Sequence, residues 1–358
     1  MRTITLIPGD GIGPEITEAT LRVLDAVGFQ ADWDVQNAGE AVMEAEGTPL
    51  PTRVLESIAA TGVALKGPLT TPVGSGFRSI NVALRQAFDL YANIRPSRSF
   101  PGLALPFSDV DLVIFRENTE DLYAGIEFAQ GAAEVAQLAA LVQSSGIGKL
   151  SADAAVSIKP ITEAGCRRIV EKAFNFARAN GRSKVTAIHK ANIMKETDGL
   201  FLRVAREVAA EVEASGSPLA FDDVIVDAAC MRLVKDPAFF DVIVTENLYG
   251  DILSDLVAGL VGGLGLAPGA NIGDKVAIFE AVHGSAPKRA GQGVANPTAL
   301  ILSAALMLRH LELPDLADRI EAAVARVIAD GQALTYDLAG ERPAASTSVY
   351  ADALIAAL

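Results

Sequence analysis

The chain is poor in cysteine, in aromatic residues and in long apolar runs. Its 358 residues include two cysteines, Cys166 and Cys230, too few and too far apart for a disulfide framework or a zinc site. No apolar run approaches the roughly 18–20 residues that a membrane-spanning helix needs. The first residues, MRTITLIPGDG, lack the apolar core and cleavage site of a signal peptide. These features predict a reduced, cytoplasmic setting and no membrane partner.

Basic residues are outnumbered by acidic ones. Lys and Arg total 30 against 44 Asp and Glu, so the formal net charge is −14. This charge argues against nucleic acid or an anionic membrane surface as a partner. Hydrophobic residues make up 50% of the chain, enough for a sizeable core, and the length suggests two domains or one large domain with insertions. An anionic substrate would need a local positive pocket.

Strand-like and helix-like segments alternate along the sequence. The strand-like apolar runs are TITLIP, GVALKG, VDLVIF, KVTAIH, DVIVDA and DVIVTEN. Helical patterns such as PEITEATLRVLDAV and TEAGCRRIVEKAFNFARAN lie between several of them. Such alternation predicts an α/β fold with a largely parallel sheet. Residues 129–160 break the rhythm and are interpreted as an insertion, an interface arm, although an ordinary helix–loop–strand connection fits as well.

The usual dinucleotide-binding fingerprint is missing. GDGIG, with Gly9, Gly11 and Gly13, follows the first strand, but it is not GxGxxG, and no acidic residue follows at the expected distance. A standard Rossmann site is therefore not expected. By itself GDGIG is equally compatible with a tight strand–helix turn.

Residues 69–96 are rich in arginine and contain one acidic residue, Asp89. Ser79, Asn81 and Arg85 are predicted to share one helical face. The glycines before them, Gly74 and Gly76, free the backbone at the helix start, where N–H groups favour an anion. The arginines of this region are Arg78, Arg85, Arg95 and, just beyond, Arg98. Guanidinium groups bind carboxylates in pairs of hydrogen bonds, so a polycarboxylate is indicated, with scattered surface arginines as the alternative.

Two further strands end in reactive side chains. Arg116 lies near the carboxyl end of the strand VDLVIF, and Tyr123 follows it. His189 and Lys190 end the strand KVTAIH. Sites of α/β proteins gather at such strand ends. Tyrosine and lysine both have an ordinary pKa of about 10 and can act as acid and base when their surroundings shift it.

The segment NLYGDILSD places Asp251 and Asp255 four residues apart on a helix. Like charges at this spacing cost about 0.2–0.5 kcal/mol, so a cation between them would be stabilising. Oxygen ligands of this kind suit Mg²⁺ or Mn²⁺. Alternatively, Asp251 favours the helix dipole and Asp255 is solvated.

Taken together, these motifs resemble the isocitrate dehydrogenases of the β-decarboxylating dehydrogenase family. The matching segments are GDGIGPE, LTTPVGSGFRSINVALRQAFDLYANIRP, FRENTEDLYAGIE, HKANIMK, NLYGDILSD and EAVHGSAPKRAG, in the family's order. The resemblance implies a two-domain fold that is not a standard Rossmann fold. It places residues 1–90 and 263–358 in a large domain with the cofactor loop, residues 91–262 in a small domain, and a clasp between subunits at 121–162.

The resemblance also assigns roles. Substrate carboxylates would bind Ser79, Asn81, Arg85, Arg95 and Arg116. Lys190, assisted by Asp227, would take the proton of the substrate hydroxyl as hydride leaves for the nicotinamide, and Tyr123 would protonate the enolate carbon after CO₂ departs. The Mg²⁺ or Mn²⁺ ligands would be Asp227, Asp251 and Asp255. Since Lys190 and Asp227 would be donated to the neighbouring subunit's site, a homodimer is expected.

The substrate and cofactor are inferred from single positions. Ser79 and Asn81 stand where isopropylmalate enzymes have apolar side chains, so isocitrate is favoured over homoisocitrate and 3-isopropylmalate. In the loop 283–297, Lys288 stands where NAD-dependent relatives usually have aspartate, so NADP is favoured over NAD. Position 289 is commonly tyrosine in NADP enzymes, and Gly340 replaces an arginine of some members. The implied cofactor-binding residues are Thr70, His283, Lys288, Arg289, Asn296 and Tyr336.

Two other functions remain open. A regulatory subunit would bind isocitrate without turnover, but Tyr123, Lys190, Asp227, Asp251 and Asp255 are all present. A metal-dependent hydrolase would leave the arginine-rich segment and the loop at 283–297 unexplained. Phosphorylation of Ser79 would repel a tricarboxylate, yet nothing in the sequence shows whether a kinase acts there.

Overall fold

The computed structural model describes residues 1–71 and 79–358, so Gly74, Gly76 and Arg78 lie outside the described residues. Its central feature is a sheet of ten strands in the order β2-β1-β3-β12-β11-β4-β5-β10-β8-β9. The strands are β1 (Arg2–Ile7), β2 (Ala31–Val35), β3 (Val63–Lys66), β4 (Ala92–Arg98), β5 (Asp111–Glu117), β8 (Lys184–His189), β9 (Ala220–Ile225), β10 (Val242–Thr245), β11 (Pro268–Ile272) and β12 (Ala277–Ala281).

The sheet is parallel at both flanks and antiparallel in the middle. The first flank joins β2, β1, β3 and β12, and the other joins β5, β10, β8 and β9. Between them β12, β11, β4 and β5 pair antiparallel. All six strand-like runs form strands, although DVIVDA leaves the strand early, because α8 (Val226–Lys235) begins directly after Ile225. Asp227 therefore lies in the first turn of a helix.

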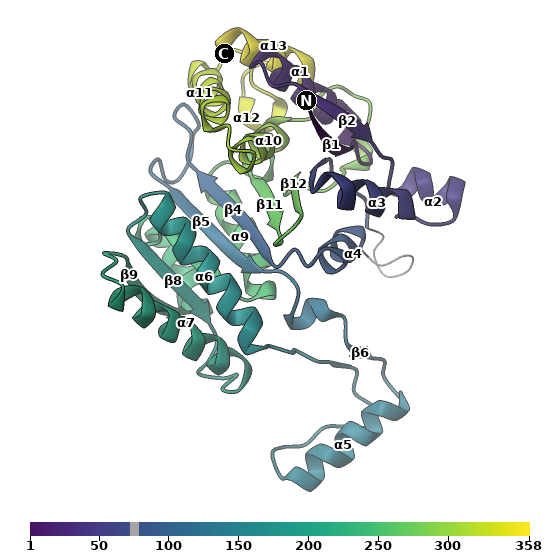
Figure 1. Ribbon diagram of the computed structural model, residues 1–358, viewed down its shortest axis with the longest axis vertical. Coiled ribbons are helices and arrows are strands. Elements are labelled where there is room, and N and C mark those ends of the chain that lie inside the picture. The colour runs from purple at the N-terminus through teal and green to yellow at the C-terminus, as the bar shows by residue number, and fades with distance from the viewer. Residues whose placement is uncertain (72–78) are drawn as a thin grey trace.

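Helices cover the sheet as the alternating pattern predicts (Figure 1). Around the first flank lie α1 (Gly13–Ala26), α3 (Thr52–Thr61), α10 (Thr298–His310), α11 (Pro314–Asp330) and α13 (Thr347–Ala357). The second flank carries α6 (Glu163–Ala179), α7 (Thr197–Ala214), α8 and α9 (Asn247–Leu260). The shorter helices are α2 (Glu40–Glu46), α4 (Ile80–Ala87) and α12 (Tyr336–Ala339), with 3-10 turns at Asp121–Ala124, Pro237–Phe239, Leu264–Leu266 and Pro287–Arg289.

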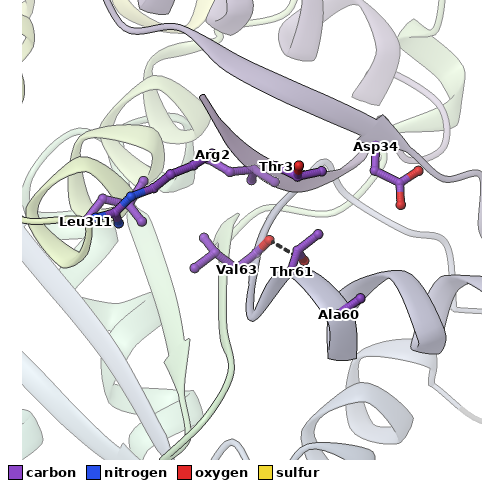
Figure 2. Close-up of a pocket in the computed structure, with 8 residues that line it drawn as sticks. Arg2, Thr3, Asp34, Ala60, Thr61, Val63 and Leu311 are labelled. Atoms are coloured by element: carbon purple, nitrogen blue, oxygen red, sulfur yellow. Dashed lines mark hydrogen bonds between the residues drawn. The ribbon is translucent and has the colours of Figure 1, made fainter.

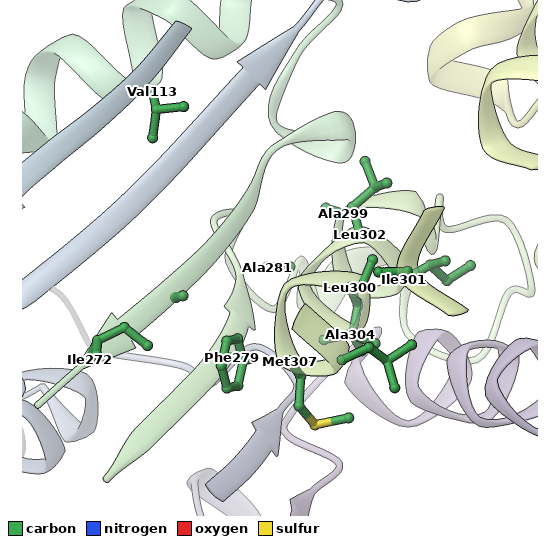
Figure 3. Close-up of a cluster of buried hydrophobic side chains, with 14 of the residues drawn as sticks. Val113, Ile272, Phe279, Ala281, Ala299, Leu300, Ile301, Leu302, Ala304 and Met307 are labelled. Carbon is green, nitrogen blue, oxygen red and sulfur yellow. The ribbon is translucent and has the colours of Figure 1, made fainter. Parts of the chain in front are cut away.

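The main hydrophobic core is centred on α10. This helix buries Leu300, Ile301 and Met307 against β11 and β12, where Phe279 lies (Figure 3). The helix is apolar on nearly every side because it also contacts α1 and α11. A buried helix needs such an all-round apolar surface. This core supports β12, whose end leads into the loop at 283–297.

An arm extends from the body at residues 126–158. It consists of β6 (Glu127–Phe128) paired with β7 (Val156–Ser157) and of α5 (Ala133–Ser145), which Figure 1 shows well away from the sheet. Leu141 and Ile147 are exposed, and Val135 is the buried residue of α5. A protruding apolar helix agrees with the interpretation of this region as an interface arm. The predicted domain boundaries stay a prediction, since one continuous sheet joins β11 to β4 across them.

Candidate active site

Three buried arginines meet where the sheet changes direction. Arg116 lies near the carboxyl end of β5, Arg95 comes from the antiparallel neighbour β4, and Arg85 comes from the last turn of α4. Their exposed fractions are 1%, 6% and 8%. Arginine is rarely buried this deeply without a partner, so this cluster marks a specialised site. The sequence prediction that these residues converge is confirmed.

Each guanidinium is held by a different polar group. Arg116 donates from Nε to Asn247 Oδ1 at 2.9 Å and pairs with Asp251. Arg95 donates from Nε to Asn93 Oδ1 at 2.6 Å. Arg85 Nη2 lies 3.8 Å from Glu280 Oε1. These contacts fix the direction in which the remaining N–H groups point.

Part of the donor capacity is unused. Within the described residues, Arg85 Nε, Arg95 Nη1 and Arg116 Nη2 are buried and have no hydrogen-bond partner. A buried donor left without an acceptor costs about 1–3 kcal/mol. Burial also lowers the pKa of Arg85, and it lowers the pKa of Arg95 to about 10, which still leaves both cationic at neutral pH. Unpaired guanidinium donors of this kind fit a ligand with several carboxylates.

A buried ion pair beneath the arginines was not foreseen. Lys66 Nζ lies 2.6 Å from Glu280 Oε2, and Asn271 donates to the other oxygen at 2.7 Å. Burial raises the pKa of Glu280, but Lys66 and Arg85 outweigh it and bring the pKa down to about 2. Glu280 is therefore a fixed counter-charge for the arginine cluster. A glutamate inside the apolar strand AIFEA was the signal that could have revealed it.

The aspartate pair lies beside Arg116 on α9. Asp251 accepts from Arg116 and from the hydroxyl of Tyr123, and the Arg116 guanidinium lies 4.9 Å from the Tyr123 ring centroid. Burial opposes the charge on Asp251, but Arg116 outweighs it and lowers the pKa. Burial and Asp251 together raise the pKa of Asp255. One carboxylate that suppresses the ionisation of the next is the arrangement that a divalent cation reverses.

The donor set of the aspartate pair fits Mg²⁺ or Mn²⁺, since both ligands are carboxylates that face the same pocket. Within residues 1–71 and 79–358, no three His, Cys, Asp or Glu side chains gather closely enough to hold a metal. Asp227 is therefore not a third ligand within this subunit. Its proposed role as a ligand for the neighbouring subunit stays a prediction.

Lys190 and Asp227 form a separate pair. Lys190 follows the end of β8, and its ammonium binds the carboxylate of Asp227, which lowers the pKa of Asp227. No contact joins this pair to the arginine cluster in the part of the chain that the structure describes. His189 is occupied structurally, because its ring contacts Asp223 at 3.2 Å and accepts the Ala191 N–H at 3.0 Å.

The predicted substrate hydroxyl and amide lie at the entrance to α4. Ser79 is the N-cap residue of this helix, and Asn81 is half-buried in its first turn. Asn81 Oδ1 has no hydrogen-bond partner among the described residues. Both side chains therefore share the short helix that carries Arg85, as the sequence predicts.

The loop at 283–297 is anchored by side chains that the sequence did not single out. Thr70 Oγ1 and Ser285 Oγ are 2.7 Å apart, and Glu15 accepts the N–H groups of Gly293 and Ala295. Asn296 donates to Asp337 at 2.9 Å. Burial lowers the pKa of His283, so its ring is neutral at pH 7. Lys288 is exposed, and the Arg289 guanidinium lies 4.0 Å from the Tyr336 ring centroid.

The GDGIG motif forms a tight turn that touches this loop. Gly11 has a φ of +59°, and a Cβ there would stand 2.0 Å from the carbonyl oxygen of Ser285. The Ile12 N–H donates to the same oxygen at 2.9 Å. Only glycine permits such a close approach in this conformation. The motif therefore places the start of α1 directly against the loop.

A hollow of about 510 Å³ lies elsewhere, at the amino ends of β1 and β3 (Figure 2). Its walls include Arg2, Thr3, Asp34 and Thr61. Active sites of α/β sheets form at the opposite, carboxyl ends of the strands. This hollow is consequently not a rival to the arginine cluster. Among the described residues, no helix is both long and apolar enough to cross a bilayer.

The fold and the charged cluster define a dehydrogenase class, and comparison with known proteins identifies the family. The family model for isocitrate/isopropylmalate dehydrogenase matches residues 3–354. The chain therefore belongs to the isocitrate/isopropylmalate dehydrogenase family, as its motifs indicated.

The relatives narrow the comparison. The isocitrate dehydrogenase (NAD) subunit alpha of Macaca fascicularis is 48% identical over 95% of this chain and 91% of its own length. Catalytic subunit 5 of the corresponding enzyme from Arabidopsis thaliana is 47% identical over 94% and 84%. The crystal structure of isocitrate dehydrogenase from Methylococcus capsulatus is 53% identical, covers 100% and 99% of the two chains and superposes with a TM-score of 0.91.

Proposed function

We propose that the chain catalyses the oxidative decarboxylation of isocitrate to 2-oxoglutarate and CO₂, with reduction of NADP or NAD and with Mg²⁺ or Mn²⁺. The observation that carries the proposal is the set of unpartnered donors on Arg85, Arg95 and Arg116 beside the carboxylates of Asp251 and Asp255. A tricarboxylate chelated to a divalent cation satisfies both halves of this set. The isocitrate dehydrogenase names of the relatives support the same substrate.

The described contacts suit the roles that the family resemblance implies. Arg85, Arg95 and Arg116 bind and orient the substrate carboxylates. Burial and Asp251 raise the pKa of Tyr123, so its hydroxyl keeps its proton and can donate it to carbon. Asp251 and Asp255 would hold the cation, which supplies polarisation of the substrate oxygens. Lys190 with Asp227 supplies the base for the hydroxyl proton.

The choice of nicotinamide cofactor has two lines of support that differ. Lys288 and Arg289 provide two cations for the 2′-phosphate of NADP, and this is the choice that the residues favour. The preference is not confirmed, because relatives with about 48% identity carry NAD in their names. Arg289 is also engaged over the Tyr336 ring, which leaves Lys288 as the less committed cation. NAD is therefore the second candidate.

A steady-state comparison tests the whole proposal. The purified chain is assayed for kcat/KM with isocitrate, homoisocitrate and 3-isopropylmalate, each with NAD and NADP, in Mg²⁺, Mn²⁺ or EDTA. We expect isocitrate to exceed the other two by at least about tenfold, since one methylene is worth about 1–3 kcal/mol. A higher value for either competitor would reassign the substrate. Metal-independent inertness with every pair would instead support a regulatory, isocitrate-binding subunit.

We also propose a homodimer with shared active sites. The separation of the Lys190–Asp227 pair from the arginine cluster within one subunit supports this arrangement. Mixing Lys190→Ala subunits with Tyr123→Phe subunits, each inactive alone, is expected to restore part of the activity, because hybrid dimers contain one intact site. No recovery after subunit exchange has been verified by mass spectrometry would contradict a shared site.

A further inference from the structure

A buried ammonium lies at the base of the arm, outside the arginine cluster. Lys159 follows β7, and its side chain is 13% exposed. Its Nζ lies 2.5 Å from Asp198 Oδ1, 2.7 Å from Glu246 Oε2 and 3.9 Å from Asp121 Oδ1. All three carboxylates are at least 98% buried. One cation thus holds together three acidic side chains from three separate elements.

The first of these carboxylates leads to Tyr123. Asp121 opens the 3-10 turn that carries Tyr123, and it has a φ of +68°, which is uncommon for a residue with a side chain. Its Oδ1 accepts the Leu122 N–H at 2.8 Å, and its Oδ2 accepts the Leu248 N–H of α9 at 2.7 Å. The backbone N–H of Asp121 donates to Pro160 O at 3.0 Å, beside Lys159. The turn with Tyr123 is therefore fastened to the α9 start and to the arm base.

The second carboxylate leads to Lys190. Asp198 lies in the first turn of α7 and is fully buried. Its Oδ1 receives the Lys159 ammonium, and its Oδ2 accepts the backbone N–H of Lys190 at 2.7 Å. The position of the Lys190 backbone is thus tied to the same ammonium that contacts Asp121.

Glu246 completes the cluster at the start of α9. It is the N-cap residue of the helix that carries Asp251 and Asp255. The ring of Tyr249, on the same helix, lies 4.9 Å from Lys159 Nζ. The pairing is stabilising as a unit, whereas loss of the ammonium alone leaves uncompensated buried carboxylates that repel one another. They would then move apart, and the attached elements would move with them.

We propose that Lys159 is a positioning residue that keeps Tyr123 and Lys190 in reactive geometry by clamping Asp121 and Asp198. The inference rests on the proposed function, in which Tyr123 is the acid and Lys190 the base. It adds that the two reactive residues of one subunit are coupled through one buried cation. If the sites are shared between subunits, this cation links the acid of one site to the base of the other.

The test is steady-state kinetics of the Lys159→Met protein with isocitrate and Mn²⁺. We expect kcat to fall by about 10- to 100-fold, since displacements of about 1 Å at reacting groups have this effect. The KM for isocitrate should stay within about twofold, because Arg85, Arg95 and Arg116 do not contact Lys159. A merely structural role would lower the amount of active protein and leave kcat per folded site unchanged.

The matched control removes a cation from the same neighbourhood without touching the clamp. Arg203 lies on α7, is exposed, and pairs with Glu163 and Glu207. Arg203→Met is expected to leave kcat and KM within about twofold. If Lys159→Met does not fold, the double variant Lys159→Met/Asp198→Asn removes the charge of the pair together and is measured in its place. It is expected to show the same fall in kcat.

The outcomes separate this inference from the proposed function. An unchanged kcat in the folded Lys159 variant, with an active wild type, would overturn the inference alone. A rise in KM at constant kcat would also overturn it, since it would place Lys159 in substrate binding. Absence of isocitrate turnover by the wild-type chain would overturn the proposed function, and the inference with it.

Discussion

Gly250 lies on α9 against the stem of Arg116, and its replacement by alanine gives a sharp test of the arginine cluster. An added Cβ would stand 2.5 Å from Arg116 Cγ and 2.6 Å from Arg116 Cβ, whereas real contacts are rarely below 3.0 Å. These atoms are at the root of the side chain, so they cannot swing away cheaply. Alanine gains about 0.5–1 kcal/mol in a helix over glycine, but overpacking costs about 1–3 kcal/mol. We therefore expect a net loss of stability.

The displacement should also reach the substrate site. Arg116 is fixed by Asn247 and Asp251, and a shift of about 1 Å would break both contacts and misplace the free Nη2 donor. We expect kcat/KM for isocitrate to fall by about 10- to 100-fold in Gly250→Ala, measured beside urea unfolding.

Gly259 on the same helix is the matched control, because a Cβ there meets no atom within 4 Å. Gly259→Ala should gain about 0.5–1 kcal/mol and keep its activity. A Gly250→Ala protein as stable and as active as Gly259→Ala would refute the packing argument.

Three further changes test separate parts of the site. Lys288→Asp exchanges a cation for a hydrogen-bond acceptor, so the ratio of kcat/KM for NAD over NADP should rise by about tenfold or more, and an unchanged ratio would remove Lys288 from the cofactor site. The folded pKa of Glu280 is depressed from 4.5 to about 2, so its contribution of about 3 kcal/mol is present above pH 4.5 and disappears as the pH falls toward 2; acid unfolding of Glu280→Gln should show a smaller loss over this window than the wild type, and equal losses would contradict the ion-pair argument. Removal of divalent cations with EDTA should abolish turnover and weaken isocitrate binding measured by calorimetry, whereas intact affinity in EDTA would show that the aspartate pair holds no metal that touches the substrate.

The sequence was most informative where local pattern determines structure. Strands such as KVTAIH and helices such as TEAGCRRIVEKAFNFARAN are visible as periodic apolar runs, and strand ends locate Arg116 and Lys190. The antiparallel middle of the sheet could not be read, because β11 and β12 are short and their partners lie far away in the chain. Lys66 and Glu280 were missed for the same reason, as their pairing joins residues more than 200 positions apart. The clamp around Lys159 likewise depends on long-range contacts.

The charges of the arginine cluster explain why a tricarboxylate and a divalent ion suit it together. Its cations are Lys66, Arg85, Arg95 and Arg116, and its carboxylates are Glu280, Asp251 and Asp255. Four positive charges against three negative ones leave a net charge of plus one when Asp255 is ionised. A tricarboxylate with a divalent cation brings minus one, so the loaded site is neutral, which a poorly solvated site favours. A dicarboxylate with the same ion would leave the site positive, and a tricarboxylate without the ion would leave it negative. Charge therefore acts with the polar side chains of Ser79 and Asn81 to favour isocitrate over 3-isopropylmalate.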